Sequence, residues 1–172
     1  MASRRKSRER ALQVLFLCDL GKHDIDEAIE AYYYTLHSDD EDFSQLPNDL
    51  FMEELVRGAM AKRESLDEQI GKASEHWRID RMPSVDRNIL RLASFELLDG
   101  KLPYAVIIDE ALELARRYSG HESVAFVNGV LDSIRASREQ PGLKKVAPEV
   151  SLADTEGGEN PVKDVVGRSG SS

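Results

Sequence analysis

The sequence of 172 residues is poor in cysteine and in long apolar segments. Its single cysteine, Cys18, cannot form a disulfide within the chain, which suits a reducing compartment. No apolar run approaches the roughly 20 residues of a membrane-spanning helix. We therefore expect a globular cytoplasmic protein that makes no contact with a membrane.

The motifs of the common enzyme classes are also missing. The sequence contains no GxGxxG, P-loop, HExxH, GxSxG or CxxC pattern. Its four histidines are scattered, and none lies at metal-ligand spacing from another. We therefore predict no catalytic residue, no cofactor and no metal, and interpret the chain as a binding protein.

The charged residues are unevenly distributed. The 32 acidic residues exceed the 23 basic ones and give a net charge of −9, so the protein as a whole repels nucleic acid phosphates. The N-terminal segment 4–10, here named the basic head, is the exception, because five basic residues stand there against one acid: Arg4, Arg5, Lys6, Arg8 and Arg10. Arginine can bind two phosphate oxygens at once. The basic head is therefore either an RNA-binding segment or a solvated stretch that aids solubility.

Apolar residues recur at the three- to four-residue spacing of helices through most of the chain. This spacing, with the glycine and proline breaks, predicts helices over 5–20, 24–36, 48–62, 65–73, 83–99, 103–119 and 123–137. Asn48 and the Ser65–Glu68 pair are the predicted caps of the third and fourth helices. No window alternates apolar and polar residues as a strand would, so we predict an all-α fold, a compact bundle of about seven helices.

The ordered part of the chain is expected to end near residue 140. Residues 141–172 are rich in glycine, proline and serine. Such a composition cannot bury enough apolar surface to offset the entropy of ordering. We therefore predict one helical domain over 1–140 and a disordered polar tail over 141–172.

Two further features stand on the helix predicted over 83–99. Arg87 and Arg91 are four residues apart and lie off the apolar face that Val85 and Ile89 define, so we expect both to project outward. They form either a second basic site or an ordinary solvated surface. Glu96 falls on the apolar face, where a charged carboxylate must be paired. A structural ion pair or a contact with a helix cap is a better explanation for Glu96 than a catalytic acid.

The most specific string of the sequence is FVNGVLD at 126–132. Upstream lie ILRLA at 89–93 with FEL at 95–97, PYAV at 103–106 and DEALELA at 109–115, and the front contributes RERALQ at 8–13 with LF at 15–16. In this order and spacing, the strings resemble the NusB family of transcription antitermination factors over about residues 4–136.

The resemblance implies an all-helical fold of seven helices in two subdomains. It implies binding to the boxA element of nascent ribosomal RNA transcripts together with NusE, a small-subunit ribosomal protein. The pair would join other Nus factors on RNA polymerase and help it read through terminators. The acidic total fits this role, because an acidic flank could dock a basic ribosomal protein while the arginines face RNA.

The resemblance also implies which residues bind. The predicted RNA-binding residues are Arg4, Arg5, Lys6, Arg8, Arg10, Arg87, Arg91, His121, Glu122 and Asn128. The predicted partner-binding residues are Phe16 and Asp86. The chain departs from the family pattern at Phe16, where Tyr is common, at Asp109, where Asn is usual, and at Ala125, which is basic in some members.

Two other interpretations of the sequence remain open. NusB-like domains also stand at the front of certain RNA cytosine methyltransferases, but those enzymes need a nucleotide-binding domain and a catalytic cysteine after the helices, where this sequence has a polar tail. The other interpretation is a helical protein that self-associates through its apolar faces, and a homodimer of this kind could cover the basic head. Salt-dependent binding to a boxA RNA would separate the RNA-binding interpretation from both.

Overall fold

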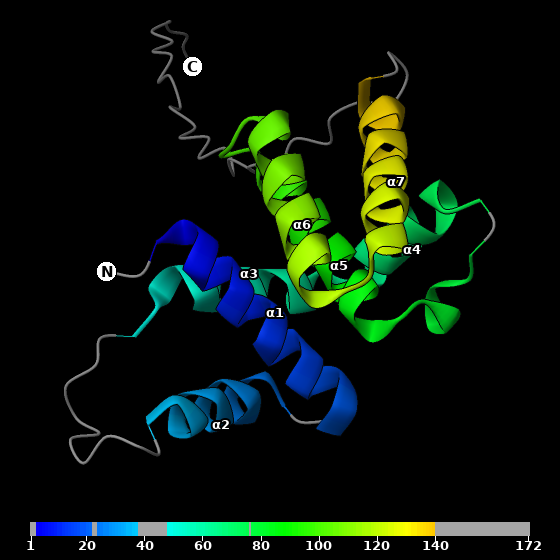
Figure 1. The fold of residues 1–172 in the computed structure, drawn as a ribbon. Coiled ribbons are helices and arrows are strands. Elements are labelled where there is room, and N and C mark those ends of the chain that lie inside the picture. The colour runs from blue at the N-terminus through cyan, green and yellow to red at the C-terminus, as the bar shows by residue number, and fades with distance from the viewer. Residues whose placement is uncertain (1–2, 22–23, 38–47, 76, 140–172) are drawn as a thin grey trace, which may run out of the picture. The chain divides into compact units, whose positions relative to one another are not determined.

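The computed structural model describes residues 3–21, 24–37, 48–75 and 77–139. Within these residues it contains seven α-helices, one 3-10 helix and no strand (Figure 1). The elements are α1 (Arg4–Gly21), α2 (Ile25–His37), α3 (Leu50–Ala61), α4 (Arg63–Ala73), η1 (Ile79–Arg81), α5 (Ser84–Asp99), α6 (Tyr104–Tyr118) and α7 (His121–Glu139). The prediction of an all-α fold is confirmed for this part of the chain. The tail predicted over 141–172 and the domain boundary predicted near 140 lie outside the described residues.

Several helix ends follow the signals in the sequence. Pro83 and Pro103 directly precede α5 and α6. Gly100 ends α5 in the left-handed conformation, with φ of 68°, and donates its N–H to the carbonyl of Glu96 (3.1 Å). Glycine adopts this conformation without the steric cost that a Cβ would bring.

Two predicted caps are wrong. The N-cap of α3 is Asp49 rather than Asn48, and its carboxylate accepts the N–H of Met52 (3.1 Å). The same carboxylate accepts the Ser7 hydroxyl (2.8 Å) from α1, so a tertiary contact favours Asp49 over its neighbour. Ser65 lies inside α4, because the break between α3 and α4 falls at Lys62 and no side chain caps α4.

The helices form two groups around α5. In the first group, α1 packs against α2 and α3, and in the second, α4, α6 and α7 pack around α5 (Figure 1). Helix α5 also packs against α1 and α3, and it buries ten of its residues, so the two groups are halves of one compact unit. At the contact of α3 with α5, a Cβ on Gly58 would lie 2.0 Å from the ring of Phe95. Only glycine permits this close approach.

A buried ion pair joins the N-terminal half of α1 to α5. Arg8 is 4% exposed and Glu96 is 8% exposed. Arg8 donates through Nε to Oε2 of Glu96 (2.9 Å) and through Nη2 to Oε1 (2.6 Å). The ion pair predicted for Glu96 is therefore confirmed. The prediction that Arg8 stands available to RNA is wrong, because α1 packs this residue against α5 and its guanidinium is bound to the carboxylate.

We predict that Arg8→Met lowers the free energy of unfolding by about 3 kcal/mol or more, because it leaves the Glu96 carboxylate buried without its partner. Urea unfolding at neutral pH measures the change. Arg4→Met is the matched control, since Arg4 is exposed on the preceding turn of α1. Equal stabilities of the two variants would contradict a structural role for Arg8.

Candidate functional site

The first two turns of α1 carry the exposed part of the basic head. Arg4, Arg5 and Lys6 are exposed, and the side chains of Arg5 and Lys6 keep 56% and 55% of their accessible surface. The guanidinium of Arg4 lies 5.3 Å from the centre of the Phe51 ring, and Arg4 forms no ion pair with another described residue, although Glu54, Glu96 and Asp99 line the same cavity. Such a contact with a ring face holds an arginine in place without using its N–H donors. Phe51 in this position could not be found from the sequence, because α3 brings it there.

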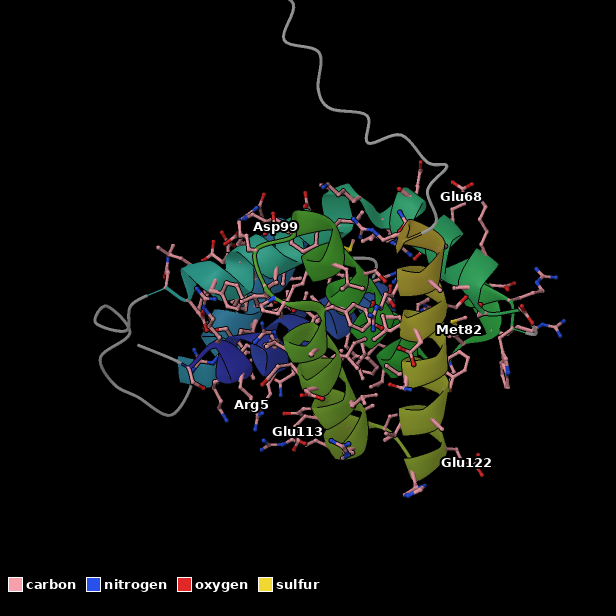
Figure 2. The ribbon with its side chains drawn as sticks, turned by 90° about the horizontal axis from the view of Figure 1, so that it is seen from above. Arg5, Glu68, Met82, Asp99, Glu113 and Glu122 are labelled. Atoms are coloured by element: carbon pink, nitrogen blue, oxygen red, sulfur yellow. The ribbon has the colours of Figure 1, made fainter. Side chains whose placement is uncertain are left out.

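Arg5 is oriented by a carboxylate of α6. Its Nη2 and Nε donate to Glu110 at 2.8 and 3.2 Å. The hydrogen bond from Arg5 lowers the pKa of Glu110, although partial burial of that carboxylate acts in the opposite direction. The same bond and the charge of Glu110 raise the pKa of Arg5. One edge of the guanidinium is thus bound to the protein, while Arg5 as a whole stays at the surface (Figure 2).

The remaining member of the basic head has an internal partner. Arg10 is half-buried, and its Nη1 donates to Oδ2 of Asp49 (3.0 Å). The basic head therefore divides into three exposed cations and two residues, Arg8 and Arg10, that bind carboxylates of α5 and of the N-cap of α3. Spacing on α1 alone does not show this division, because the carboxylates come from other parts of the chain.

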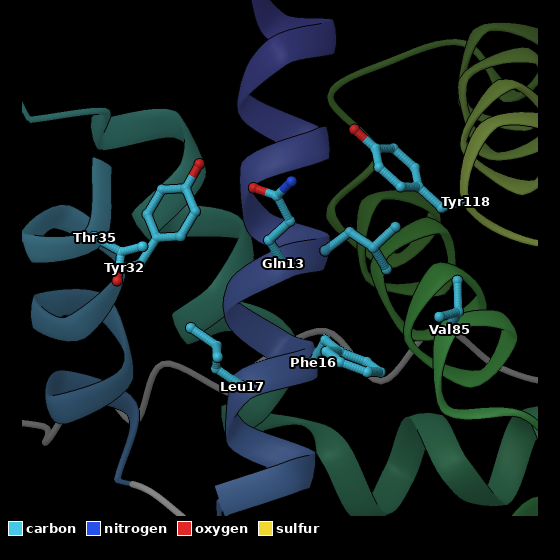
Figure 3. Close-up of a pocket in the computed structure, with 8 residues that line it drawn as sticks. Gln13, Phe16, Leu17, Tyr32, Thr35, Val85 and Tyr118 are labelled. Atoms are coloured by element: carbon cyan, nitrogen blue, oxygen red, sulfur yellow. The ribbon is translucent and has the colours of Figure 1, made fainter. Parts of the chain in front are cut away.

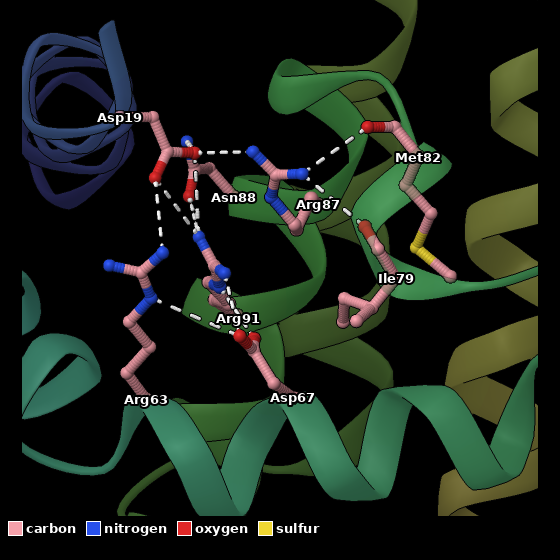
Figure 4. Close-up of polar contacts among 8 residues, drawn as sticks. All are labelled: Asp19, Arg63, Asp67, Ile79, Met82, Arg87, Asn88 and Arg91. Carbon is pink, nitrogen blue, oxygen red and sulfur yellow. Dashed lines mark hydrogen bonds and ion pairs between the residues drawn. The ribbon is translucent and has the colours of Figure 1, made fainter.

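The expectation that Arg87 and Arg91 project outward is wrong. Arg91 is 2% exposed and donates to both carboxylate oxygens of Asp67 on α4 (2.7 Å each). Arg87 donates to Asp19 on α1 (2.9 Å), which also lies 3.4 Å from Nη1 of Arg91 (Figure 4). The side of α5 that looks polar in the sequence is covered by α1 and α4, so its arginines form a buried polar network.

Asp86 is also internal. It is 3% exposed, and its carboxylate accepts the hydroxyls of Ser119 (2.6 Å) and Ser123 (2.9 Å). These bonds fasten the connection between α6 and α7 to the first turn of α5. The prediction that Asp86 touches a partner protein is therefore not supported by its position.

The other predicted residues lie on α7. His121 and Glu122 are exposed at its first turn, and Asn128 is partly buried and donates to Oδ2 of Asp132 (3.1 Å). These three residues lie together on one helix but apart from the basic head in sequence. Their proposed contact with RNA stays a prediction.

A largely apolar cavity of about 410 Å³ surrounds Phe16. The lining residues are Leu12, Gln13, Phe16, Leu17, Tyr32, Thr35, Val85 and Tyr118. Figure 3 shows them converging on α1, with Tyr32 and Thr35 from α2 on one side and Val85 and Tyr118 on the other. Burial raises the pKa of Tyr32 to about 12, so its hydroxyl stays protonated at neutral pH. The sequence singled out Phe16, but four helices assemble the cavity.

Two further findings concern the kinds of site that the described residues offer. None of the helices in this part of the chain is long and apolar enough to cross a membrane. The described residues also bring together no group of three His, Cys, Asp or Glu side chains that could hold a metal ion.

We predict an acid-sensitive contribution from Asp19. Burial acts to raise the pKa of this carboxylate, but the hydrogen bond from Arg87 and the charges of Arg91 and Arg87 outweigh it and lower the pKa. The stabilisation is therefore complete above the unfolded value of about 4 and is lost as the pH falls through the folded-state pKa. Asp19→Asn should unfold about 3 kcal/mol more easily at pH 7, and this difference should shrink below about pH 4.

Thermal or urea unfolding of both proteins across pH 7 to 3 measures the effect of Asp19→Asn. Glu68→Gln, which removes an exposed ion pair with Lys72, is the control and should change little. A difference in unfolding free energy between wild type and Asp19→Asn that stays constant with pH would contradict the lowered pKa of Asp19.

Comparison with known proteins agrees with the family resemblance. Residues 5–136 match the model of the NusB family. The transcription antitermination protein NusB of Solibacter usitatus (strain Ellin6076) is 52% identical over 141 residues, which are 82% of this chain and 94% of that protein. Relatives with this name are regulatory proteins, so the prediction of a non-enzymatic role is confirmed.

Two solved structures share the fold. NusB of T. maritima superimposes with a TM-score of 0.67 at 33% identity and covers 78% of this chain and 92% of its own. The second is the crystal structure of the antitermination factors NusB and NusE in complex with dsRNA. Its matching chain has a TM-score of 0.66 at 28% identity and covers 78% of this chain and 96% of its own. From the family model, the sequence identity and the seven-helix fold, we conclude that this chain belongs to the NusB family of transcription antitermination proteins.

Proposed function

We propose that this chain binds the boxA element of nascent ribosomal RNA transcripts together with NusE, and helps RNA polymerase read through terminators. The observation that carries the proposal is the likeness to a NusB chain solved in complex with NusE and dsRNA. The exposed cations at the start of α1 supply a surface suited to phosphate. Other Nus factors and the polymerase complete the proposed assembly, which acts in the cytoplasm. A homodimer that covers the basic head stays a prediction.

The proposed RNA contacts of the basic head are Arg4, Arg5 and Lys6. All three are exposed, and Arg4 and Arg5 are held by Phe51 and Glu110, so little side-chain entropy is lost when they bind phosphate. Arg8 and Arg10 have a supporting role. Their bonds to Glu96 and Asp49 fix the part of α1 that presents the other three cations. Arg87 and Arg91 have the same supporting role on α5.

The proposed NusE surface is the cavity around Phe16. Its apolar lining favours an apolar side chain of a partner. Helix α2, which forms one wall, begins with the exposed carboxylates of Asp26 and Glu27 and carries exposed Glu30 further on. Ribosomal proteins are typically basic, so the acidic residues on this helix complement the expected charge of the partner, although Asp26 already binds Arg57.

We predict that replacing Arg4, Arg5 and Lys6 together by Ala weakens boxA binding and leaves the melting temperature nearly unchanged. Loss of three phosphate contacts should reduce the slope of log K against log salt by about 2, at about 0.7 per contact with single-stranded RNA. Fluorescence anisotropy with a labelled boxA RNA across a salt series measures both quantities. An unchanged slope, or equal affinity of the wild type for a scrambled RNA, would count against the proposal.

We also predict that Phe16→Ala weakens NusE binding by at least tenfold, because a central aromatic anchor contributes about 2 kcal/mol or more. Leu50→Ala removes an exposed apolar side chain at the start of α3 and is the control. Calorimetric titration with NusE measures the affinities.

NusE should tighten RNA binding by the wild type but much less by Phe16→Ala, since both proteins act on one strand. If Phe16→Ala and Leu50→Ala changed the affinity for NusE equally, the cavity around Phe16 would not be the NusE surface.

A further inference from the structure

A buried carboxylate on α1 binds two exposed cations from different helices. Glu9 is 6% exposed. Its Oε1 accepts a hydrogen bond from Nη1 of Arg117 on α6 (2.7 Å), and its Oε2 lies 3.4 Å from Nζ of Lys6. Because both cations bind one carboxyl group, Arg117 lies beside Lys6 of the basic head, although it stands 108 residues after Glu9 in the sequence.

The charges of this group differ in their access to solvent. The side chains of Lys6 and Arg117 keep 55% and 56% of their accessible surface, whereas the Glu9 carboxylate is almost fully buried. Two positive charges against one negative charge leave an excess of one positive charge. An anion that approaches from solvent therefore meets the ammonium group of Lys6 and the guanidinium group of Arg117 before it meets the carboxylate.

Arg117 keeps hydrogen-bond donors for a ligand. Glu9 uses only its Nη1, and Arg117 forms no ion pair with any other residue in the described part of the chain. Its guanidinium lies 5.6 Å from the centre of the Tyr118 ring, and this contact limits its orientations without using N–H groups. Nε and Nη2 of Arg117 can therefore donate to the oxygens of a phosphate.

The neighbouring carboxylates of α6 bind other arginines. Glu110 accepts Nη2 of Arg5 (2.8 Å), and Glu113 accepts Nη1 of Arg116 (3.2 Å). A carboxylate whose charge is balanced by a bound arginine repels a phosphate less than a free one. The acidic residues of α6 therefore do not cancel the positive charge that Lys6 and Arg117 present.

Arg117 connects the two surfaces of the proposed function through direct contacts. It shares Glu9 with Lys6 of the basic head, and its guanidinium packs on the ring of Tyr118. Tyr118 in turn lines the cavity around Phe16 (Figure 3). A ligand that binds Lys6 and Arg117 thus lies next to the wall of that cavity.

We propose that Arg117 and Lys6 together form a phosphate site, which extends the RNA surface of the basic head onto α6. The inference rests on the proposed RNA-binding function. It directs the RNA strand from the start of α1 toward the cavity around Phe16, which is the proposed NusE surface. A phosphate contact of this kind adds affinity without reading the identity of the bases. An acidic segment of NusE is the competing occupant, and the experiment below separates it from RNA.

The test compares two adjacent arginines of α6 in the full chain. Arg117→Ala removes a cation of the proposed site. Arg116→Ala removes the same charge and is the matched control, because Arg116 is also 56% exposed but binds Glu113 of its own helix. Fluorescence anisotropy with a labelled boxA RNA across a salt series measures both variants. Arg117→Ala should bind several-fold more weakly and lower the slope of log K against log salt by about 0.7, whereas Arg116→Ala should leave the slope unchanged.

The alternative roles of Arg117 give different results. Equal slopes for Arg117→Ala and Arg116→Ala would overturn the inference, because they would show at most a general effect of charge. Unchanged RNA binding with weaker NusE binding, measured by calorimetric titration, would assign Arg117 to the partner protein and would also overturn it. A lower melting temperature with an unchanged salt slope would show that Arg117 only fastens α6 to α1. We expect the melting temperature of Arg117→Ala to change little, since Glu9 keeps Lys6 as a partner.

The proposed function is judged separately from Arg117. If the wild type failed to bind boxA RNA, the proposed function itself would fail. If the wild type bound boxA RNA and the Arg4, Arg5 and Lys6 variant bound it weakly, the proposed function would stand whatever the result for Arg117→Ala.

Discussion

The buried ion pair of Arg8 with Glu96 ties the N-terminal half of α1 to α5. A charged pair in this environment stabilises the fold only while both partners and their hydrogen bonds are present, so a shift of α1 that separated Arg8 from Glu96 would leave a buried charge without its partner. Asp49 and Glu110 hold Arg10 and Arg5 on either side of this contact. The direction in which Arg4, Arg5 and Lys6 leave the surface follows from these carboxylates as much as from the sequence of α1.

The acidic excess of the chain and its local basic surfaces have a common explanation. Many carboxylates lie inside the bundle or at its helix contacts, where they bind arginines from other helices, as Asp19 and Asp67 bind Arg87 and Arg91. Such arginines are unavailable to a ligand, but they fix the relative positions of α1, α4 and α5. The exposed cations outside these buried pairs include Arg4, Arg5 and Lys6 at the start of α1. Total charge is consequently a poor guide to what one surface of this protein can bind.

Helix α1 carries both surfaces of the proposed function. Its first turns present the exposed cations, and Phe16 and Leu17 further along line the apolar cavity. Because both stand on one helix held by the same buried contacts, RNA and a partner protein would meet at a fixed relative geometry. This arrangement gives a physical basis for joint binding without any change in the conformation of the chain.

The sequence by itself determined the helical fold, most helix boundaries and the family, because apolar periodicity and the Pro and Gly signals act locally and the FVNGVLD string is specific. It also indicated that Glu96 is paired, since a charge on an apolar face needs a partner. Only the tertiary structure decided which cations are exposed. Arg8, Arg91 and Asp86 look like surface residues in their own helices, yet all three are buried. Arg8 binds Glu96, Arg91 binds Asp67, and Asp86 accepts the hydroxyls of Ser119 and Ser123. Helical spacing describes one helix at a time, whereas burial and ion pairing depend on residues that other helices bring near.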